Sequence, residues 1–291
     1  MSSQPFFSKE TYIARRQVLK QQVGQGIILL PGNNESSANY KDNWYPFRQD
    51  STFLYYAGII QAGLALVIDA ATGQEILFGD ELSIDDIVWT GPLPSLAELA
   101  AAAGIQKVLP AKEITNYLKG DVLYLPSYRG EQTIAISSWL NKPVQQVQSG
   151  ASVTLIKAIA KQRSCKTEEE LVQIDKACTV TSRMHRAVMM GTKEGMYEYE
   201  ACAIAQKLMW DYHSQNAFLP IVTINGNVLH NHVHANKLTS GKMLLFDSGT
   251  ELPNGYCGDM TRTIPVDKTF TAKQREIYNV VHASYSKAVS L

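Results

Sequence analysis

The sequence predicts an α/β domain followed by an α+β domain. Over residues 1–150, apolar runs of strand length alternate with segments of helical periodicity, a pattern typical of α/β layer domains. From residue 151 onward, helical segments come first and a strand-rich stretch over 218–266 follows them. A length of 291 residues also favours two domains, since one domain commonly holds roughly 100–200 residues. We therefore expect domains over 1–150 and 151–291.

The first domain should form a mixed sheet with helices on its faces. Residues 8–23 have the spacing of an amphipathic helix, and Ser8 is placed to cap its first turn. An Ala-rich helix over 96–103 should end at Gly104, a favourable C-terminal cap. Short apolar runs predict the strands of the sheet, at 26–31, 64–69, 74–78, 108–109 and 122–125.

The second domain should open with a long helix over 167–190. Thr167 followed by Glu170 has the pattern of a capping box, and Gly191 is placed to end the helix. Apolar positions recur at helical spacing and predict a core-facing stripe that includes Leu171, Ile174 and Val180. The further segments are a helix at 197–212, central strands at 218–222 and 243–246, and a helix at 272–290.

Charge and composition exclude several classes of protein. Twenty-seven basic residues balance 27 acidic ones, so binding to nucleic acid through bulk electrostatics is not expected. No apolar run approaches the length of a membrane-spanning helix, and the N-terminus has no secretory signal, so we expect neither a membrane partner nor secretion. The cysteines have no paired spacing, which favours reduced thiols in the cytoplasm. They are Cys165, Cys178, Cys202 and Cys257.

Two aspartates are the first candidates for chemistry. The apolar run 243–248 delivers Asp247 into the expected core, and the following strand carries Asp259, 12 positions later. If a hairpin turns at 252–255 with an odd-length loop, both aspartates point to one face, within about 8 Å at the backbone. Two carboxylates so close repel each other, so one must be protonated or a cation must lie between them. Oxygen ligands suit Mn²⁺, Mg²⁺ or Ca²⁺, whereas Zn²⁺, Fe²⁺ or Co²⁺ become suitable if histidine joins them.

Three histidines, His230, His232 and His234, precede the aspartates at alternate positions. On a strand they would share one face, where three imidazoles could bind zinc by themselves. On a surface loop they would be ordinary polar side chains. Histidine near a carboxylate pair raises the expectation of a metal site, and two metals about 3.5–4 Å apart are a known device for amide hydrolysis.

The spacing of these residues matches a known family. Leu229-His230 lies 17 residues before the Asp-Ser-Gly that begins at Asp247, and Gly-Asp-Met-Thr-Arg-Thr follows over 258–263. This stretch resembles the pita-bread metallopeptidases that cleave next to proline, namely Xaa-Pro aminopeptidase (aminopeptidase P) and Xaa-Pro dipeptidase (prolidase). The spacing between the aspartates is one residue longer than the commoner family spacing, which an extra turn residue, Pro253 or Asn254, would explain.

The resemblance extends along nearly the whole chain. It implies an N-terminal creatinase-type α/β domain followed by part of a pita-bread domain, in which helices cover the outer face of a curved antiparallel sheet. The matching segments outside the aspartate motifs are 48–53, 56–58, 166–171, 195–200 and 270–278.

The resemblance also implies roles for individual residues. Asp247 would chelate one metal ion and Asp259 would bridge two. His230 would face the substrate beside the metals and stabilise the tetrahedral intermediate. Thr261 and Arg262 would support Asp259 from behind. The family assigns no role to the other two histidines.

The activity that the resemblance implies is metal-dependent hydrolysis of Xaa-Pro bonds at the N-terminus of peptides. Two divalent ions are implied, with Mn²⁺ as the first expectation and Zn²⁺ or Co²⁺ as alternatives. The substrates would be peptides with proline at the second position, and the complete protein would be a homo-oligomer, a dimer or tetramer. The family completes its metal site with a histidine and two glutamates downstream of the helix that begins near Ala272. Because the sequence ends at Leu291, we expect a C-terminally truncated and inactive chain.

Other functions remain open at this point. Xaa-Pro dipeptidase activity is the alternative within the same chemistry. A non-catalytic pita-bread module that binds peptides, and a metal-free amidinohydrolase of the creatinase type, are alternatives of other classes. The retained aspartate pair and His230 favour the peptidase, and metal content would separate it from the other two classes.

Overall fold

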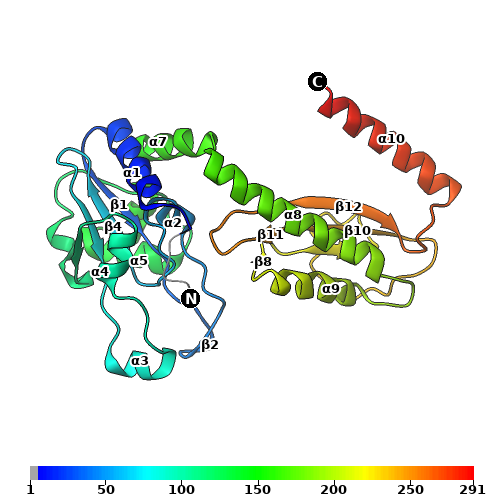
Figure 1. Cartoon of the computed structure of the whole chain (residues 1–291), viewed down its shortest axis with the longest axis horizontal. Helices are drawn as coiled ribbons and strands as arrows, with labels where there is room; N and C mark the ends of the chain where they lie inside the picture. Colours follow the sequence, from blue (N-terminus) through cyan, green and yellow to red (C-terminus); the bar gives the residue numbers. More distant parts are fainter. Residues whose placement is uncertain (1–5) are drawn as a thin grey trace. The chain divides into compact units, whose positions relative to one another are not determined.

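The computed structural model describes residues 6–291, and the chain divides into two compact units between Lys166 and Thr167 (Figure 1). This division lies beyond the boundary near 150 that the sequence predicts, because helix α7 (Val153–Ser164) packs against α1 (Lys9–Val23) in the first unit. Among the described residues, no helix combines the length and apolarity needed to cross a membrane.

The first unit is built on a five-stranded sheet in the order β6-β5-β4-β1-β7. Strand β4 runs antiparallel to both of its neighbours, whereas the outer strands β6 and β7 pair in parallel. The predicted mixed sheet is therefore confirmed. Its strands are β1 (Ile27–Pro31), β4 (Ala65–Asp69), β5 (Glu75–Phe78), β6 (Lys107–Leu109) and β7 (Val122–Leu123).

Helices cover both faces of this sheet because its side chains alternate between the faces. Ile28 and Leu30 of β1 belong to the cluster with α1, α2, α4 and α7, whereas Leu29 belongs to the cluster with η1, α5 and α6. The predicted cap of α1 is confirmed, since the Ser8 side chain accepts from the amide of Thr11. The remaining elements are β2 (Ser37–Tyr40), β3 (Asn43–Trp44), α2 (Ser51–Ala57), α3 (Ile84–Thr90), α4 (Leu96–Ala102), η1 (Ala111–Asn116), α5 (Gly130–Leu140) and α6 (Val144–Ser149).

A buried arginine joins three elements of the first unit. Arg16 of α1 is fully buried, and its Nε donates to the Glu75 carboxylate at 2.7 Å. Its other nitrogens donate to the carbonyl oxygens of Tyr56 (2.8 Å) and Ala103 (2.9 Å), at the ends of α2 and α4. Burial lowers the pKa of the guanidinium, and the Glu75 carboxylate opposes that shift.

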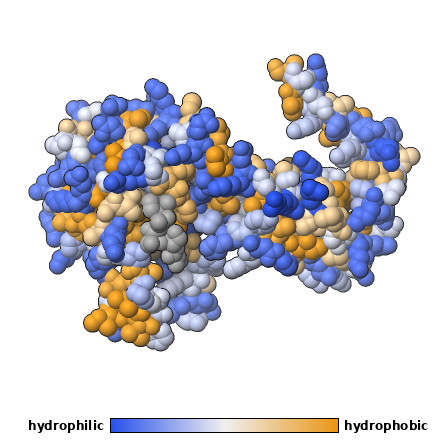
Figure 2. Space-filling view, in the orientation of Figure 1, coloured by the Kyte–Doolittle hydropathy of each residue, from blue (hydrophilic) through white to orange (hydrophobic). Residues whose placement is uncertain are grey.

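The surface of the first unit is apolar over α3 (Figure 2). This helix buries no residue, and its Trp89 is 87% exposed. Ile84 and Val88 are exposed beside it. Helix α3 therefore adds nothing to the core of this unit.

The second unit places two helices on one face of an antiparallel sheet. The strand order is β12-β10-β9, and the apolar core lies between this sheet and helices α8 and α9. A second pair, β8 with β11, continues beside it. The elements are α8 (Glu168–Gly191), α9 (Glu198–Asp211), β8 (Gln215–Asn216), β9 (Ile221–Thr223), β10 (Met243–Ser248), β11 (Thr250–Glu251), β12 (Met260–Pro265) and α10 (Ala272–Val289).

Most of the predicted helix boundaries in this unit are confirmed, but three details differ. The capping box of Thr167 and Glu170 is present. Gly191 is the last residue of α8, whose cap is Thr192, and a Cβ atom at Gly191 would lie 2.8 Å from the terminal methyl group of Ile204 on α9. Leu171 is 43% exposed rather than in the core, because the first turn of α8 buries Glu170 instead. The strand predicted at 218–222 is β9, which lies at an edge of this sheet rather than in its centre.

Helix α10 buries none of its residues. It is held near its start, where Gln274 donates to the carbonyl of Gly241 at 3.0 Å and the rings of Phe270 and Tyr278 lie 5.0 Å apart.

Candidate metal centre

The two candidate aspartates lie on one continuous hairpin. Asp247 of β10 pairs with Thr261 of β12 in an antiparallel register, and the same register continues to the bridge between Glu251 and Cys257. Five residues, 252–256, then close the loop. Because residues two apart on a strand share a face, Asp259 lies on the same face as Thr261 and diagonal to Asp247. The predicted odd-length hairpin is therefore confirmed.

The two faces of this hairpin differ in their surroundings. Phe246 and Ser248 alternate with Asp247 and are buried toward α8, whereas Asp247 is half-buried and Asp259 is exposed. The carboxylates thus occupy the face that α8 and α9 leave open.

Two glycines allow the strands that carry the aspartates to lie close to each other and to α8. A Cβ atom at Gly249 would overlap the carbonyl oxygen of Gly258. A Cβ atom at Gly258 would overlap Thr181 Oγ1 and lie 2.9 Å from the carbonyl oxygen of Ala177, both on α8. The glycines of the Asp-Ser-Gly and Gly-Asp motifs are therefore required by packing around the aspartates.

The tip of the hairpin is hydrogen-bonded to the start of α8. Asn254 is buried, and its side-chain amide donates to Gln173 at 2.8 Å. The hydroxyl of Tyr256 donates to Glu170 at 2.8 Å. Asn254, one of the two residues proposed as the extra turn residue, therefore has a structural contact of its own.

The three histidines lie on a loop rather than on a strand. His230 is exposed in a turn, and its ring centroid is 6.2 Å from that of His232. His232 Nδ1 and His234 Nε2 both donate to the carbonyl oxygen of Pro220, at 3.2 and 3.1 Å. Pro220 directly precedes Ile221, which is the partner of Asp247 on β9. The structure thus brings the histidine loop to the row of the sheet that contains Asp247.

The donor set fits a hard divalent cation. In the part of the chain that the structure describes, neither Asp247 nor Asp259 has an ion-pair partner. Carboxylate oxygens suit Mn²⁺ or Mg²⁺, so Asp247 and Asp259 could supply part of a ligand set for such an ion. Over residues 6–291, no group of three or more histidine, cysteine, aspartate or glutamate side chains could hold a metal ion. The histidines therefore do not form a zinc site by themselves in this structure.

The other two predicted site residues face opposite ways. Thr261 pairs with Asp247 and lies on the aspartate face, whereas Arg262 pairs with Phe246 and lies on the α8 side. The Arg262 guanidinium donates to the carbonyl oxygen of Thr261 at 2.7 Å. Support of Asp259 by these two residues stays a prediction.

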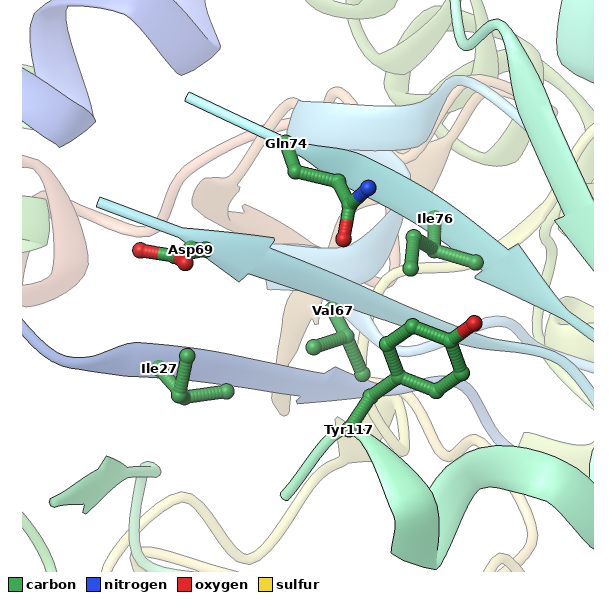
Figure 3. Close-up of a pocket in the computed structure, with 6 residues that line it drawn as sticks. All are labelled: Ile27, Val67, Asp69, Gln74, Ile76 and Tyr117. Carbon is green, nitrogen blue, oxygen red and sulfur yellow. The ribbon is translucent and has the colours of Figure 1, made fainter. Parts of the chain in front are cut away.

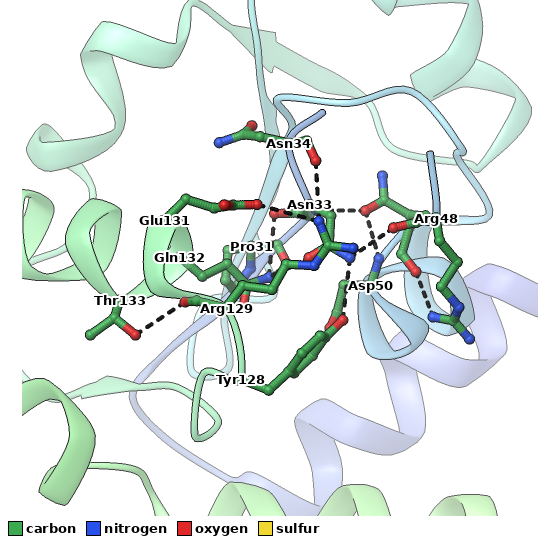
Figure 4. A network of polar contacts seen from close by, with 12 residues as sticks. Pro31, Asn33, Asn34, Arg48, Asp50, Tyr128, Arg129, Glu131, Gln132 and Thr133 are labelled. Atoms are coloured by element: carbon green, nitrogen blue, oxygen red, sulfur yellow. Dashed lines mark hydrogen bonds and ion pairs between the residues drawn. The ribbon is translucent and has the colours of Figure 1, made fainter. Parts of the chain in front are cut away.

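The upstream motif at 48–53 forms a polar network in the first unit (Figure 4). Asp50 caps α2 by accepting from the amides of Thr52 and Phe53, and it also accepts from the hydroxyl of Tyr128 at 3.2 Å. Asn33, which follows β1, donates to the carbonyl of Arg48 at 2.8 Å. These residues join the end of β1 to the start of α2, so the motif has a structural role here.

A small cavity of about 60 Å³ also lies in the first unit (Figure 3). None of the predicted site residues lines it. Its lining is Ile27, Val67, Asp69, Gln74, Ile76 and Tyr117.

Comparison with known families identifies both halves of the chain. The profile described as "Aminopeptidase P, N-terminal domain" matches residues 12–124, and the profile described as "Metallopeptidase family M24" matches residues 172–291. The chain belongs to the aminopeptidase P family. The predicted creatinase-type domain and partial pita-bread domain are thereby confirmed.

Curated relatives of the aminopeptidase P family match most of this chain. The Xaa-Pro aminopeptidase of Escherichia coli K12 is 27% identical over 307 residues, which cover 98% of this chain and 68% of that protein. A probable Xaa-Pro aminopeptidase of Metarhizium acridum is 30% identical, with 88% of this chain and 51% of that protein covered. The chain thus spans about half to two thirds of the length of these relatives.

Solved structures of E. coli aminopeptidase P have the same fold. A zinc-substituted form in complex with product has a TM-score of 0.85 and 25% identity, over 98% of this chain and 68% of that chain. A glutamate-to-alanine variant in complex with substrate has a TM-score of 0.85 and 26% identity, over the same shares.

Sequence reasoning missed two buried residues near the aminopeptidase P motifs. Glu198, at the start of α9, is fully buried and accepts hydrogen bonds from Ile224 and Asn236. Its position inside the segment 195–200 was the available signal, but sequence spacing does not show which glutamate of that segment turns inward.

His185 of α8 is the second missed residue. It is 2% exposed, its Nε2 donates to the carbonyl of Ser248 at 3.2 Å, and its ring lies 4.5 Å from that of Phe246. Burial lowers the pKa of its imidazole, and the charge of Arg262 lowers it further, whereas the Ser248 carbonyl and Asp247 oppose the shift. His185 therefore supports the strand of Asp247 from the core side in its neutral form.

Proposed function

We propose that this chain supplies part of a metal-dependent Xaa-Pro aminopeptidase, with Asp247 and Asp259 as metal ligands. The observation that carries the proposal is their placement diagonally on the open face of one hairpin, without an ion-pair partner among the described residues. Membership of the aminopeptidase P family supports the same assignment.

The proposed metals are two divalent ions, with Mn²⁺ preferred and Zn²⁺ or Co²⁺ as alternatives. When bound, such a pair supplies a water of lowered pKa and positive charge for the developing oxyanion. Asp247 would hold one ion and Asp259 would contribute to both.

His230 would face a peptide with proline at its second position. Its exposed imidazole can donate a hydrogen bond to the carbonyl oxygen of the Xaa-Pro bond as negative charge develops there. The loop contacts of His232 and His234 with Pro220 keep this segment beside the row that contains Asp247.

The test is Mn²⁺ binding to the 291-residue chain, measured by electron paramagnetic resonance of free Mn²⁺. Asp247→Asn and Asp259→Asn should each weaken binding by about tenfold or more, because each removes one charged ligand. Asp175→Asn is the matched control, since Asp175 is an exposed carboxylate on α8. Equal affinity in all three variants would contradict the assignment.

Peptidase assays complete the test. We expect this chain alone to release no N-terminal residue from Mn²⁺-treated peptides with proline at the second position, because only two of the implied ligands are among its residues. Release that disappears in Asp247→Asn would contradict the expected inactivity while supporting the site.

A further inference from the structure

Glu198 is a buried acidic residue for which the proposed chemistry has no use. Its side chain is fully buried at the first position of α9. A buried carboxylate is strongly destabilising unless hydrogen bonds satisfy it. The hydrogen-bond partners of Glu198 therefore show which part of the chain this side chain holds in place.

The hydrogen bonds of Glu198 all lead to one loop. Oε1 accepts from the backbone amide of Ile224 at 2.8 Å, and Oε2 accepts from the backbone amide of Asn236 at 3.1 Å. The side-chain amide of Asn236 donates to both oxygens, at 3.1 and 2.9 Å. One carboxylate thus binds both ends of the segment 224–236.

That segment is the loop that carries His230. It leaves β9 at Ile224 and returns at Asn236, whose carbonyl accepts from the amide of Glu198 at 3.0 Å. Inside the loop, the Asn231 side chain donates to Thr223 Oγ1 at 3.1 Å. The loop has no strand pairing across residues 224–236, so its shape depends on these contacts and on the hydrogen bond from the Tyr199 amide to the His234 carbonyl at 3.1 Å.

We propose that Glu198 is a positioning residue, which sets the place of the His230 imidazole by fixing both ends of the 224–236 loop. The role of His230 toward substrate rests on the proposed function, whereas the effect of Glu198 on the loop does not. Within residues 6–291, the hydrogen bonds of the Glu198 carboxylate go to Ile224 and Asn236 and to neither aspartate.

Two variants on α9 separate this role from helix capping. Glu198→Gln keeps the size of the side chain but turns one acceptor into a donor that faces Asn236. Glu200→Gln is the matched control, because Glu200 accepts only from the amide of Tyr197 at the exposed cap of the same helix. Both variants are compared in the full 291-residue chain.

The first readout is hydrogen exchange of peptides that cover 224–236. In Glu198→Gln, exchange there should rise on the order of 10- to 100-fold, while peptides of β10 and β12 stay unchanged. In Glu200→Gln, the same peptides should change by less than about twofold.

The second readout is the imidazole resonance of His230, assigned by its loss in His230→Gln. It should shift toward the value of an unstructured histidine in Glu198→Gln and stay in place in Glu200→Gln. A purely structural role of Glu198 in α9 would not move this resonance alone. Unchanged exchange and resonance in Glu198→Gln, or equal changes in both variants, would overturn the proposal.

Should Glu198→Gln fail to fold, Asn236→Ala decides the matter, because it removes the side-chain donor and leaves α9 intact. Local loosening of 224–236 in this variant supports the proposal, and unchanged exchange overturns it. Neither readout requires a bound metal ion or a peptide substrate. Failure here therefore leaves the aspartate assignment standing, and failure of Mn²⁺ binding leaves the loop result standing.

Discussion

The two units join their elements by different means. In the first, a buried guanidinium, Arg16, binds Glu75 and the ends of two helices. In the second, α8 meets the sheet through the glycine contact of Gly258 and through hydrogen bonds from uncharged groups, such as that of neutral His185. The first unit thus uses a buried charged side chain to join its elements, whereas the contacts described between α8 and the sheet of the second unit involve a glycine, backbone carbonyls and an imidazole, and the two aspartates lie on the opposite face.

The largest expected effect is the loss of stability when the buried Arg16 guanidinium is removed from the first unit. Arg16→Met should destabilise this unit by about 3–5 kcal/mol, because Glu75 loses a partner at 2.7 Å and two buried carbonyls lose their donor. The loss of unfolding free energy is measured in urea, with hydrogen exchange of β1 and β4 as the probe of the first unit.

The control for that prediction is Lys20→Met. Lys20 also pairs with Glu75, at 2.9 Å, but its side chain is partly exposed, so the change should be below about 1 kcal/mol. Similar losses of unfolding free energy in both variants would show that the buried Arg16 contributes no more than the partly exposed Lys20. The contrast between the two units would then disappear.

A smaller effect tests the contact of the second unit. Gly258→Ala should destabilise it by about 1–3 kcal/mol, because the added methyl group overlaps Thr181 Oγ1 and crowds the Ala177 carbonyl. Gly130→Ala in the first unit is the control, since a Cβ atom there meets open space. Urea midpoints measure both, and a tolerated Gly258→Ala would mean that α8 and the hairpin are not in tight contact.

The smallest effect depends on pH. Burial holds the pKa of His185 below its ordinary value, so between the folded and unfolded pKa values the unfolded chain binds the extra proton. Stability should therefore fall as the pH drops below about 6.5, with a slope of at most about 1.4 kcal/mol per pH unit, and the slope should vanish below the folded pKa.

His185→Gln should flatten that slope, and His282→Gln on exposed α10 should not. Unfolding free energies of the second unit between pH 5 and 7.5 provide the measurement. An identical slope in the chain and in His185→Gln would mean that protonation of His185 does not cause the loss of stability.

Local signals in the sequence predicted much of this molecule. The caps at Ser8 and Thr167 depend on residues three positions apart, so the sequence alone contains them. The shared face of Asp247 and Asp259 followed from the even spacing and an odd loop, which is also a local argument.

The errors have physical causes that spacing does not contain. Leu171 fits the apolar stripe of α8, yet whether a turn of a helix is covered depends on where the sheet ends. Gly191 resembles a cap, but α8 continues through it and Thr192 donates the capping hydrogen bond to Val188. The histidine loop takes its form from Glu198, whose carboxylate lies far from it in sequence.

Insertions in the hairpin of the two aspartates are not equivalent to one another. Pairing resumes at Glu251 and Cys257, so the loop between them can change in length without changing the face on which Asp259 lies. One residue inserted just after Cys257, with that pair maintained, would move Asp259 to the position that Met260 now holds opposite Ser248, on the face toward α8. The hairpin therefore tolerates changes of length at its tip. Beyond the tip, side chains alternate between the two faces of the sheet, and a single inserted residue would move every following side chain to the other face.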